Sequence, residues 1–167
     1  MILLLSLVGC VLLFLCIWGV TVTMPTRLLA KNFPKDVQEK LQPRLDTLDQ
    51  QGMTFRRVLG WVILIFFCFA YAALFVIGGM DGLHRGYSFW PFFLRFLVIG
   101  GVIKAFDIVA LDGILLTKTH FFQHYFPETE GCAGWQDFGY NRKQQLRQIV
   151  MTIIGSAVVA MIFTALG

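Results

Sequence analysis

The stretch KAFDIVALDGILLTKTHFFQHYFPETEGCAGWQDFGYNRK, residues 104–143, joins the end of an apolar run to a loop rich in aromatic and ionisable side chains. Lys104, Asp107 and Asp112 lie inside the apolar run. Ionisable groups are costly in lipid, and they persist there mainly where they pair with one another or serve a function. The stretch therefore indicates a membrane protein whose polar groups are concentrated in one region.

Four apolar runs account for most of the chain, at about 1–23, 58–80, 92–117 and 148–166. The 167 residues are 57% hydrophobic and only 14% charged, whereas an ordinary soluble domain has about 25% charged residues. About 20 mostly apolar residues are enough to cross the hydrocarbon of a bilayer. The sequence therefore predicts an all-α fold: a bundle of four transmembrane helices that forms one integral membrane domain over residues 1–167.

Basic residues are distributed unevenly among the loops. Seven lie in the loop 24–57 and four between Lys118 and Arg147, whereas the connection 80–91 has only Arg85. Lys and Arg concentrate in cytoplasmic loops, so both basic loops are predicted to be cytoplasmic and both termini outside. Topology thus accounts for the net charge of +4 and favours membrane lipids, not nucleic acid, as partners. We expect a multi-pass protein of the plasma membrane, which in a bacterium is the inner membrane.

The first basic loop contains an amphipathic segment at about 35–50. Val37, Leu41, Leu45 and Leu48 recur at spacings of four, four and three residues, which is typical of one face of a helix. Beside a bilayer, such a helix is predicted to lie in the headgroup layer.

Lys104 and Asp107 are three residues apart near the middle of the third apolar run, a spacing that places them on adjoining turns of a helix. An unpaired charge at that depth costs ~2.5–3.5 kcal/mol, so we expect the two to pair and to face the bundle. Two interpretations stay open. One is a polar lock that fixes how the helices pack, and it is slightly favoured. The other is a proton or cation relay that also uses Asp112 and His120.

The second basic loop holds the remaining candidates for a ligand site, namely His120, His124, Glu128, Glu130 and Arg142. Two histidines four residues apart share a helix face, and a carboxylate or Cys132 could complete a Zn²⁺ site with them. The sequence HFFQH lacks the glutamate that zinc proteases place beside the first histidine. We therefore predict no metal, with His120 and His124 as weak candidates. Histidines that hydrogen-bond to carboxylates or lipid headgroups are the leading interpretation.

Together these residues predict a polar pocket at the cytoplasmic mouth of the bundle, with Asp107 and Asp112 in its wall. The leading function is the binding of a lipid headgroup, an ion or a small polar ligand. The alternative is a membrane-embedded enzyme that acts on a lipid-borne group with an Asp or His as general base. The motifs identify no cofactor, since a Gly-rich phosphate loop, a GxSxG elbow and a CxxC pair are absent from the sequence. A second copy of the chain and another membrane subunit are the alternatives for a protein partner.

Three blocks in the C-terminal part carry a resemblance: FDIVALD at 106–112, PETEG at 127–131 and GWQDFGYNRK at 134–143. They resemble a group of small bacterial membrane proteins with four predicted spans. In that group an F-D-x-x-x-L-D block precedes a P-x-T-E-G turn and an aromatic segment with acidic and basic residues. The resemblance covers roughly the last 65 residues and implies a four-span architecture in a bacterial inner membrane. No activity is assigned to the group, so the resemblance implies no function.

Overall fold

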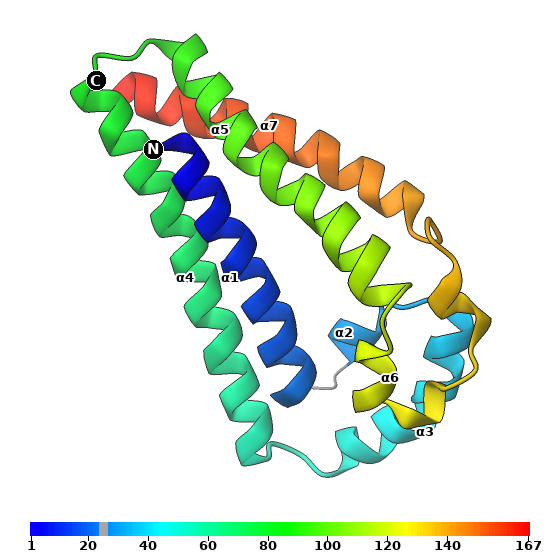
Figure 1. The fold of residues 1–167 in the computed structure, drawn as a ribbon. Coiled ribbons are helices and arrows are strands. Elements are labelled where there is room, and N and C mark those ends of the chain that lie inside the picture. The colour runs from blue at the N-terminus through cyan, green and yellow to red at the C-terminus, as the bar shows by residue number, and fades with distance from the viewer. Residues whose placement is uncertain (24–26) are drawn as a thin grey trace. The chain divides into compact units, whose positions relative to one another are not determined.

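The structure, a computed structural model, describes residues 1–23 and 27–167; residues 24–26, at the start of the first predicted cytoplasmic loop, lie outside the described residues. Within the described part, the regular structure is helical and includes no strand, which confirms the predicted all-α class. Figure 1 labels the main helices along the chain. In chain order the elements are α1 (Ile2–Thr23), α2 (Arg27–Ala30), α3 (Lys35–Gln50), α4 (Phe55–His84), α5 (Phe89–Phe106), the π-helix η1 (Asp107–Leu116), α6 (Phe121–Tyr125), the 3-10 helices η2 (Pro127–Thr129) and η3 (Ala133–Gln136), and α7 (Arg142–Leu166).

Three of the described helices, α1, α4 and α7, are long and apolar enough to cross a membrane. They correspond to the predicted spans 1–23, 58–80 and 148–166; α1 begins at Ile2, and α4 and α7 extend beyond their predicted spans. In their most apolar stretches only 22% of the residues of α1, and 17% of those of α4 and of α7, are buried inside the protein. Apolar surface of this extent is stable in contact with lipid and not with water. The chain therefore has the helices of a membrane protein.

The third predicted span, 92–117, is divided between two kinds of helix. α5 begins after Ser88, whose backbone is extended. Pro91 falls in the first turn, where its missing N–H costs no helical hydrogen bond. From Asp107 the backbone changes to the π-helix η1, in which hydrogen bonds join residues five apart. The last of these joins the amide of Thr119 to the carbonyl of Ile114 at 3.1 Å, so a uniform α-helix does not continue through this segment.

By their contacts the residues group into two compact units. The first unit contains Met1–Leu13, Phe67–Asp107 and Lys143–Gly167, and the second contains Phe14–Phe66 and Ile108–Arg142. Each unit has a core of its own.

The first unit is built from the start of α1, the end of α4, α5 and α7. Its tightest cluster contains Phe92, Phe96 and Phe163 around Ala160, with the rings of Phe92 and Phe163 stacked at 5.8 Å. The ring of Phe163 lies directly on Gly79, where an added Cβ would be only 2.1 Å from a ring carbon. Glycine at this position therefore lets α7 approach α4 closely.

Both ends of the chain lie beside the last turns of α4 in this unit (Figure 1). The side chain of Leu5, near the start of α1, lies next to Gly78. Gly167, just past α7, lies next to the side chain of Leu83. A buried arginine on α5, Arg95, joins α5 to the same part of α4 through Asp81 at 2.6 Å. The start of α1, the end of α4, the start of α5 and the end of α7 thus meet at one end of the unit.

The second unit is organised around the helix α3, which begins after Pro34 and contains Pro43 in its interior. The predicted apolar face is present, since Val37, Leu41 and Leu45 are at most 5% exposed. These side chains pack against aromatic residues of the segment 121–135 and against Ala30 and Phe33, which precede α3. The buried cluster comprises Ala30, Phe33, Val37, Leu41, Leu45, Leu116, Phe122, Phe126, Cys132 and Trp135. The face that the sequence assigns to the headgroup layer is therefore covered by the chain's own aromatic side chains.

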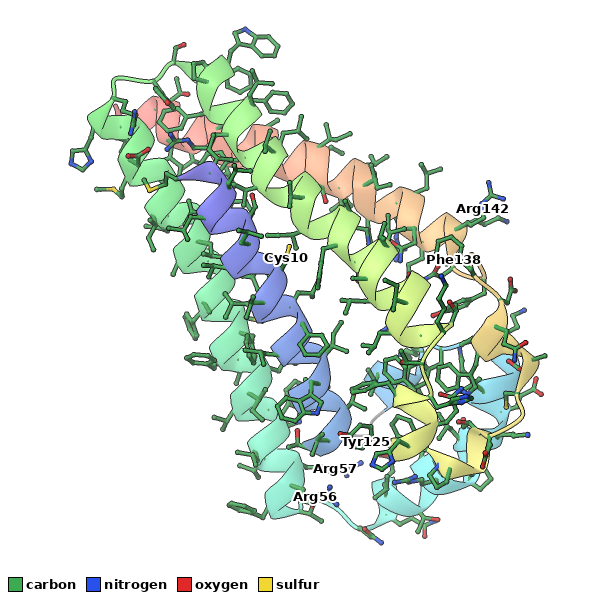
Figure 2. The ribbon with its side chains drawn as sticks, viewed as in Figure 1. Cys10, Arg56, Arg57, Tyr125, Phe138 and Arg142 are labelled. Carbon is green, nitrogen blue, oxygen red and sulfur yellow. The ribbon has the colours of Figure 1, made fainter. Side chains whose placement is uncertain are left out.

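Polar contacts of the second unit involve the last turns of α1 and the start of α4, where Figure 2 labels Arg56 and Arg57. The indole nitrogen of Trp18 donates to the hydroxyl of Tyr125 at 3.2 Å. Arg56 donates to the carbonyl of Val22 at 2.8 Å, and Arg57 pairs with Asp49 at 2.6 Å. Basic residues thus cap exposed carbonyls and carboxylates at this end of α4.

Candidate functional site

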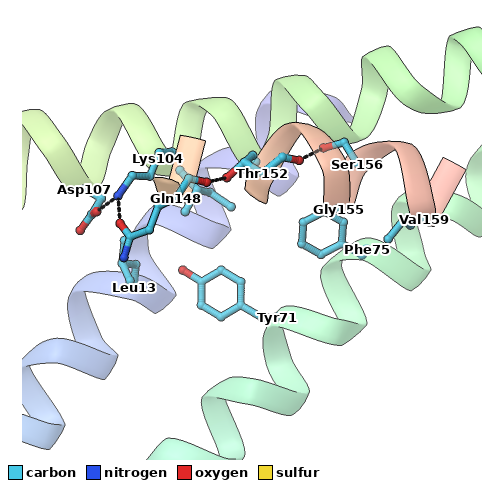
Figure 3. A pocket seen from close by; sticks show the side chains of 12 residues that line it. Leu13, Tyr71, Phe75, Lys104, Asp107, Gln148, Thr152, Gly155, Ser156 and Val159 are labelled. Carbon is cyan, nitrogen blue, oxygen red and sulfur yellow. Dashed lines mark hydrogen bonds and ion pairs between the residues drawn. The ribbon is translucent and has the colours of Figure 1, made fainter. Parts of the chain in front are cut away.

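The first unit contains a cavity of about 490 Å³ that is open to its surroundings. Figure 3 shows the side chains that line it, which come from α1, α4, α5, the first residue of η1 and α7. They are Leu13, Tyr71, Phe75, Gly100, Ile103, Lys104, Asp107, Gln148, Thr152, Gly155, Ser156 and Val159. The volume lies within the ~300–1,000 Å³ that is typical of small-molecule sites.

One end of the cavity is formed by a charged pair (Figure 3). The ammonium of Lys104 is 2.5 Å from the carboxylate of Asp107, and it also donates to the side-chain oxygen of Gln148 on α7. The side chains of Lys104 and Asp107 are 12% and 23% exposed. The predicted pairing at a spacing of three residues is therefore present, and Gln148 extends it to a second helix.

The polar end retains hydrogen-bonding capacity. An ammonium has three N–H donors, of which Lys104 uses two on Asp107 and Gln148. The side-chain amide of Gln148 also has two N–H donors, and they have no partner among the described residues. A bound molecule can thus accept hydrogen bonds from α5 and from α7 at the same point.

The rest of the wall is mainly apolar, although it includes three hydroxyl groups. The hydroxyl of Tyr71 donates to the carbonyl of Gly9 at 2.7 Å. Thr152 and Ser156 donate to backbone carbonyls one turn earlier in α7, at 2.9 and 2.7 Å. Each hydroxyl proton is therefore used within the protein. Apolar contact with Phe75 and its neighbours dominates this part of the cavity.

Glycine opens the cavity on α7. A Cβ added at Gly155 would have no heavy atom within 4 Å, so the space beside this residue is unfilled. At Gly100, on α5, an added Cβ would be 2.8 Å from the methyl group of Thr152, so glycine there allows α5 and α7 to approach each other. The two glycines thus have different roles, one in opening the cavity and one in packing.

The cavity lies along the middle of the long helices. Leu13 is close to the midpoint of α1 and Tyr71 to the midpoint of α4. Helices that cross a bilayer place their midpoints in its hydrocarbon. At membrane depth, mutual neutralisation is what makes two ionised groups tolerable.

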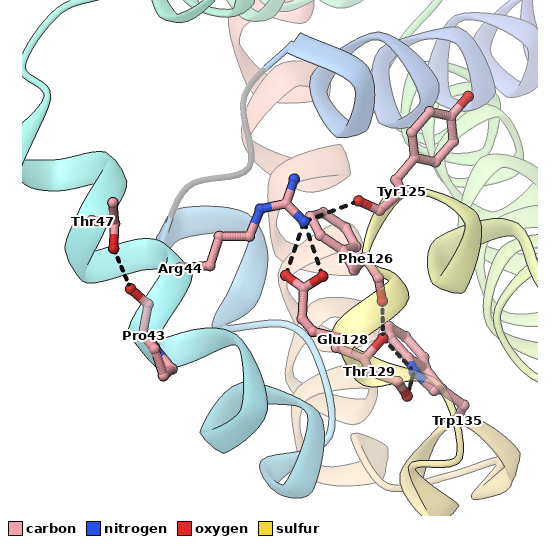
Figure 4. A network of polar contacts seen from close by, with 8 residues as sticks. All are labelled: Pro43, Arg44, Thr47, Tyr125, Phe126, Glu128, Thr129 and Trp135. Carbon is pink, nitrogen blue, oxygen red and sulfur yellow. Dashed lines mark hydrogen bonds and ion pairs between the residues drawn. The ribbon is translucent and has the colours of Figure 1, made fainter.

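A second polar network lies in the second unit (Figure 4). Arg44 of α3 contacts both carboxylate oxygens of Glu128, at 2.9 and 3.1 Å, and the carbonyl of Tyr125 at 3.2 Å. Its guanidinium also lies over the ring of Phe126, 5.4 Å from the centroid. This network joins α3 to the segment 125–128 and so stabilises the fold of the loop.

The buried indole of Trp135 holds the next turn of the same loop. It stacks on Phe122 with ring centroids 5.5 Å apart and donates to the hydroxyl of Thr129 at 3.1 Å. The amide of Gly134 donates to the carboxylate of Asp36 at 2.8 Å. These contacts explain why a loop with so many aromatic residues is folded and not extended in solvent.

Comparisons with protein-family models, with curated proteins and with solved structures return no match to this chain.

The structure divides the predicted site residues between the units. Lys104 and Asp107 line the cavity of the first unit. The others belong to the second unit: Asp112, His120, His124, Glu128, Glu130 and Arg142. Residues of the long helices, including α4 and α7, therefore line the cavity together with Lys104 and Asp107. The predicted loop residues are not among the residues that line it.

The predicted residues of the second unit have separate surroundings. Asp112 accepts a hydrogen bond from Asn141 at 2.9 Å. His120 and His124 are exposed, and the ring of His124 lies edge-on to Tyr125 at 5.2 Å. Glu130 and Arg142 are also exposed. In the part of the chain that the structure describes, no three His, Cys, Asp or Glu side chains are grouped as a metal ion would require.

Four cavity residues were missed by sequence reasoning, namely Tyr71, Gln148, Thr152 and Ser156. Each is a polar residue within or next to an apolar run, which is the only signal the sequence offers for them. Gln148 was assigned to the boundary of the last span, although α7 already begins at Arg142. A polar side chain one or two turns inside a span is a better candidate than one in a loop, because lipid exposure penalises it.

Proposed function

We propose that the protein is a four-span plasma-membrane protein that binds an amphiphilic molecule, such as a membrane lipid, in the cavity of the first unit. The observation that carries the proposal is the cavity itself. It has a mainly apolar wall and an ion-paired polar end, formed by Lys104, Asp107 and Gln148. A ligand with a polar head and an apolar chain matches both parts.

The arrangement of the first unit supports four crossings. Leu5 and Gly167 both lie beside the last turns of α4, so α1 starts and α7 ends on the same side. A chain that starts and ends on one side crosses an even number of times. α1, α4 and α7 supply three crossings, and α5 with η1 supplies the fourth. The basic loops 24–57 and 118–147 then favour a cytoplasmic location for the opposite side.

The polar contacts support binding over catalysis. A general base must be free to take a proton from its substrate. Asp107 is held by Lys104 and Glu128 by Arg44, while Asp112 accepts from Asn141. His120 and His124, the histidines predicted as candidate bases, belong to the second unit and do not line the cavity. Within the described residues, the cavity thus offers hydrogen-bonding and apolar contact without a free acid–base pair.

Native mass spectrometry of the protein extracted in a mild detergent tests the proposal. We expect the wild type to retain an amphiphile in a one-to-one complex. Gly155→Leu should abolish this retention, because the new side chain enters unfilled space beside α7 and occupies the cavity. Gly101→Leu is the matched control, since Gly101 also has no heavy atom within 4 Å of an added Cβ but does not line the cavity.

The proposal fails if the folded wild-type protein retains no amphiphile. It also fails if folded Gly155→Leu retains as much amphiphile as the wild type. Equal losses in Gly155→Leu and Gly101→Leu would also contradict it, since they would show an effect of bulk and not of the cavity. Thermal unfolding of all three proteins shows that the comparison is made between folded chains.

A further inference from the structure

We infer that the head of the bound amphiphile is uncharged, a hydroxyl or carbonyl group of a lipid from the surrounding bilayer. This inference rests on the proposed function, because it names the chemistry of the molecule that the cavity takes.

The charge balance of the polar end is the first argument. Lys104 and Asp107 lie 2.5 Å apart and neutralise one another. Lys104 and Asp107 are the charged side chains among those that line the cavity. An anionic head would compete with Asp107 for the ammonium and leave that carboxylate unpaired. A cationic head would displace Lys104 in the same way. Either exchange leaves a charge without a partner at membrane depth, which is strongly unfavourable.

The hydrogen bonds that remain available are the second argument. One N–H of Lys104 and the amide N–H groups of Gln148 are donors without a protein partner among the described residues. An oxygen that carries no charge can accept from both while the ion pair stays intact. The second oxygen of Asp107 can accept from a ligand hydroxyl in return, because only one oxygen is bonded to Lys104. A hydroxyl group satisfies both requirements at once.

The wall accounts for the other half of the ligand. Leu13, Phe75, Ile103 and Val159 line the cavity away from the charged pair, and the hydroxyls of Tyr71, Thr152 and Ser156 donate within the protein. This wall gives a hydrocarbon chain apolar contact and presents no further charge. The cavity thus selects its occupant by the head group.

Three probes with the same chain and different heads test the inference: oleyl alcohol, oleyl sulfate and oleylamine. Each is titrated into the wild-type protein in a neutral detergent, and one-to-one complexes are counted by native mass spectrometry. We expect oleyl alcohol to bind roughly a hundredfold more tightly than either charged probe, which reflects the cost of an unpaired charge at this depth. Tighter or equal binding of oleyl sulfate or oleylamine overturns the inference.

The outcomes separate the inference from the proposed function. If all three probes bind alike and Gly155→Leu abolishes their binding, the cavity binds amphiphiles but does not select an uncharged head. If none of the three binds and no native amphiphile is retained, the proposed function itself fails. The comparison among probes uses the wild type and does not depend on the folding of a charge variant.

Two variants add a change of preference as a second measurement. Asp107→Asn leaves Lys104 without its counter-ion, so this variant should prefer oleyl sulfate. Lys104→Gln leaves Asp107 alone, so that variant should prefer oleylamine. If both variants keep the wild-type preference for oleyl alcohol, the ion pair does not select the head group and the inference is wrong.

Discussion

Removal of one member of the Lys104–Asp107 pair should destabilise the protein more than removal of both. Loss of one partner of a buried ion pair costs about 3–5 kcal/mol, because the other charge is left uncompensated. Here the two side chains are 12% and 23% exposed, so we expect the lower end of that range, about 3 kcal/mol. For a chain of this size, 1 kcal/mol corresponds to about 2–4 °C in the melting temperature. Either single variant should therefore melt about 6–12 °C below the wild type.

The two single variants should not be equal. Lys104→Met removes the cation and also the donor to Gln148, so two polar groups lose a partner. In Asp107→Asn the amide oxygen can still accept from the ammonium, and Gln148 keeps its donor. We therefore expect Lys104→Met to be the less stable of the two. The double variant Lys104→Met, Asp107→Leu should recover most of the loss, since replacement of a whole buried pair by apolar side chains is often neutral.

The assay is thermal unfolding in one detergent for the wild type, both single variants and the double variant. Single variants that melt with the wild type would refute the reasoning, because they would show that neither charge depends on the other. A double variant that is less stable than both singles would also refute it. That result would mean that each charge is stabilised by a different partner.

Three further predictions concern topology and packing. In a variant without the native cysteines, a cysteine at Ser88 should react with an impermeant thiol reagent in intact cells, whereas cysteines at Gln51 and Lys143 should not; the reverse pattern would overturn the orientation. Trp135→Ala should cost about 3–5 kcal/mol, since this indole is 2% exposed, and should speed proteolysis of the second unit; an unchanged cleavage rate would contradict its role. Gly79→Ala should cost about 1–3 kcal/mol through overpacking, because the new Cβ would be 2.1 Å from the ring of Phe163. Gly101→Ala, with no atom within 4 Å, is the control and should melt with the wild type.

Local patterns in the sequence were enough to predict the long apolar helices, the buried face of α3 and the contact between Lys104 and Asp107 in the cavity. The apolar runs predicted four membrane spans, and three of them correspond to helices that are long and apolar enough to cross a membrane, because length and hydropathy are properties of a single segment. The period of Val37, Leu41 and Leu45 predicted the buried face of α3. The spacing of Lys104 and Asp107 predicted their contact, because residues three apart on a helix are neighbours whatever the rest of the chain does.

Contacts between distant segments could not be predicted in this way. Gln148 meets Lys104 across 44 positions of sequence, and Asp36 meets the amide of Gly134 across 98. No periodicity links such residues, because their approach depends on how separate helices pack. The predicted pocket therefore combined Asp107 with loop residues that are near it in sequence, whereas the cavity combines it with residues of α4 and α7. The change to a π-helix at Asp107 also has no signal in the hydrophobic pattern.

Photo-crosslinking in lipid nanodiscs tests the central claim most directly. The probe is oleyl alcohol with a diazirine in its chain, and the labelled positions are identified by mass spectrometry at residue level. The account predicts labels on the cavity side chains Tyr71, Phe75 and Val159, which excess unlabelled oleyl alcohol removes. Phe69, which is 73% exposed on α4, should be labelled as ordinary lipid-facing surface, and excess alcohol should not protect it. Labels on the cavity residues that are no stronger than on Phe69, and that excess alcohol does not remove, would contradict the account.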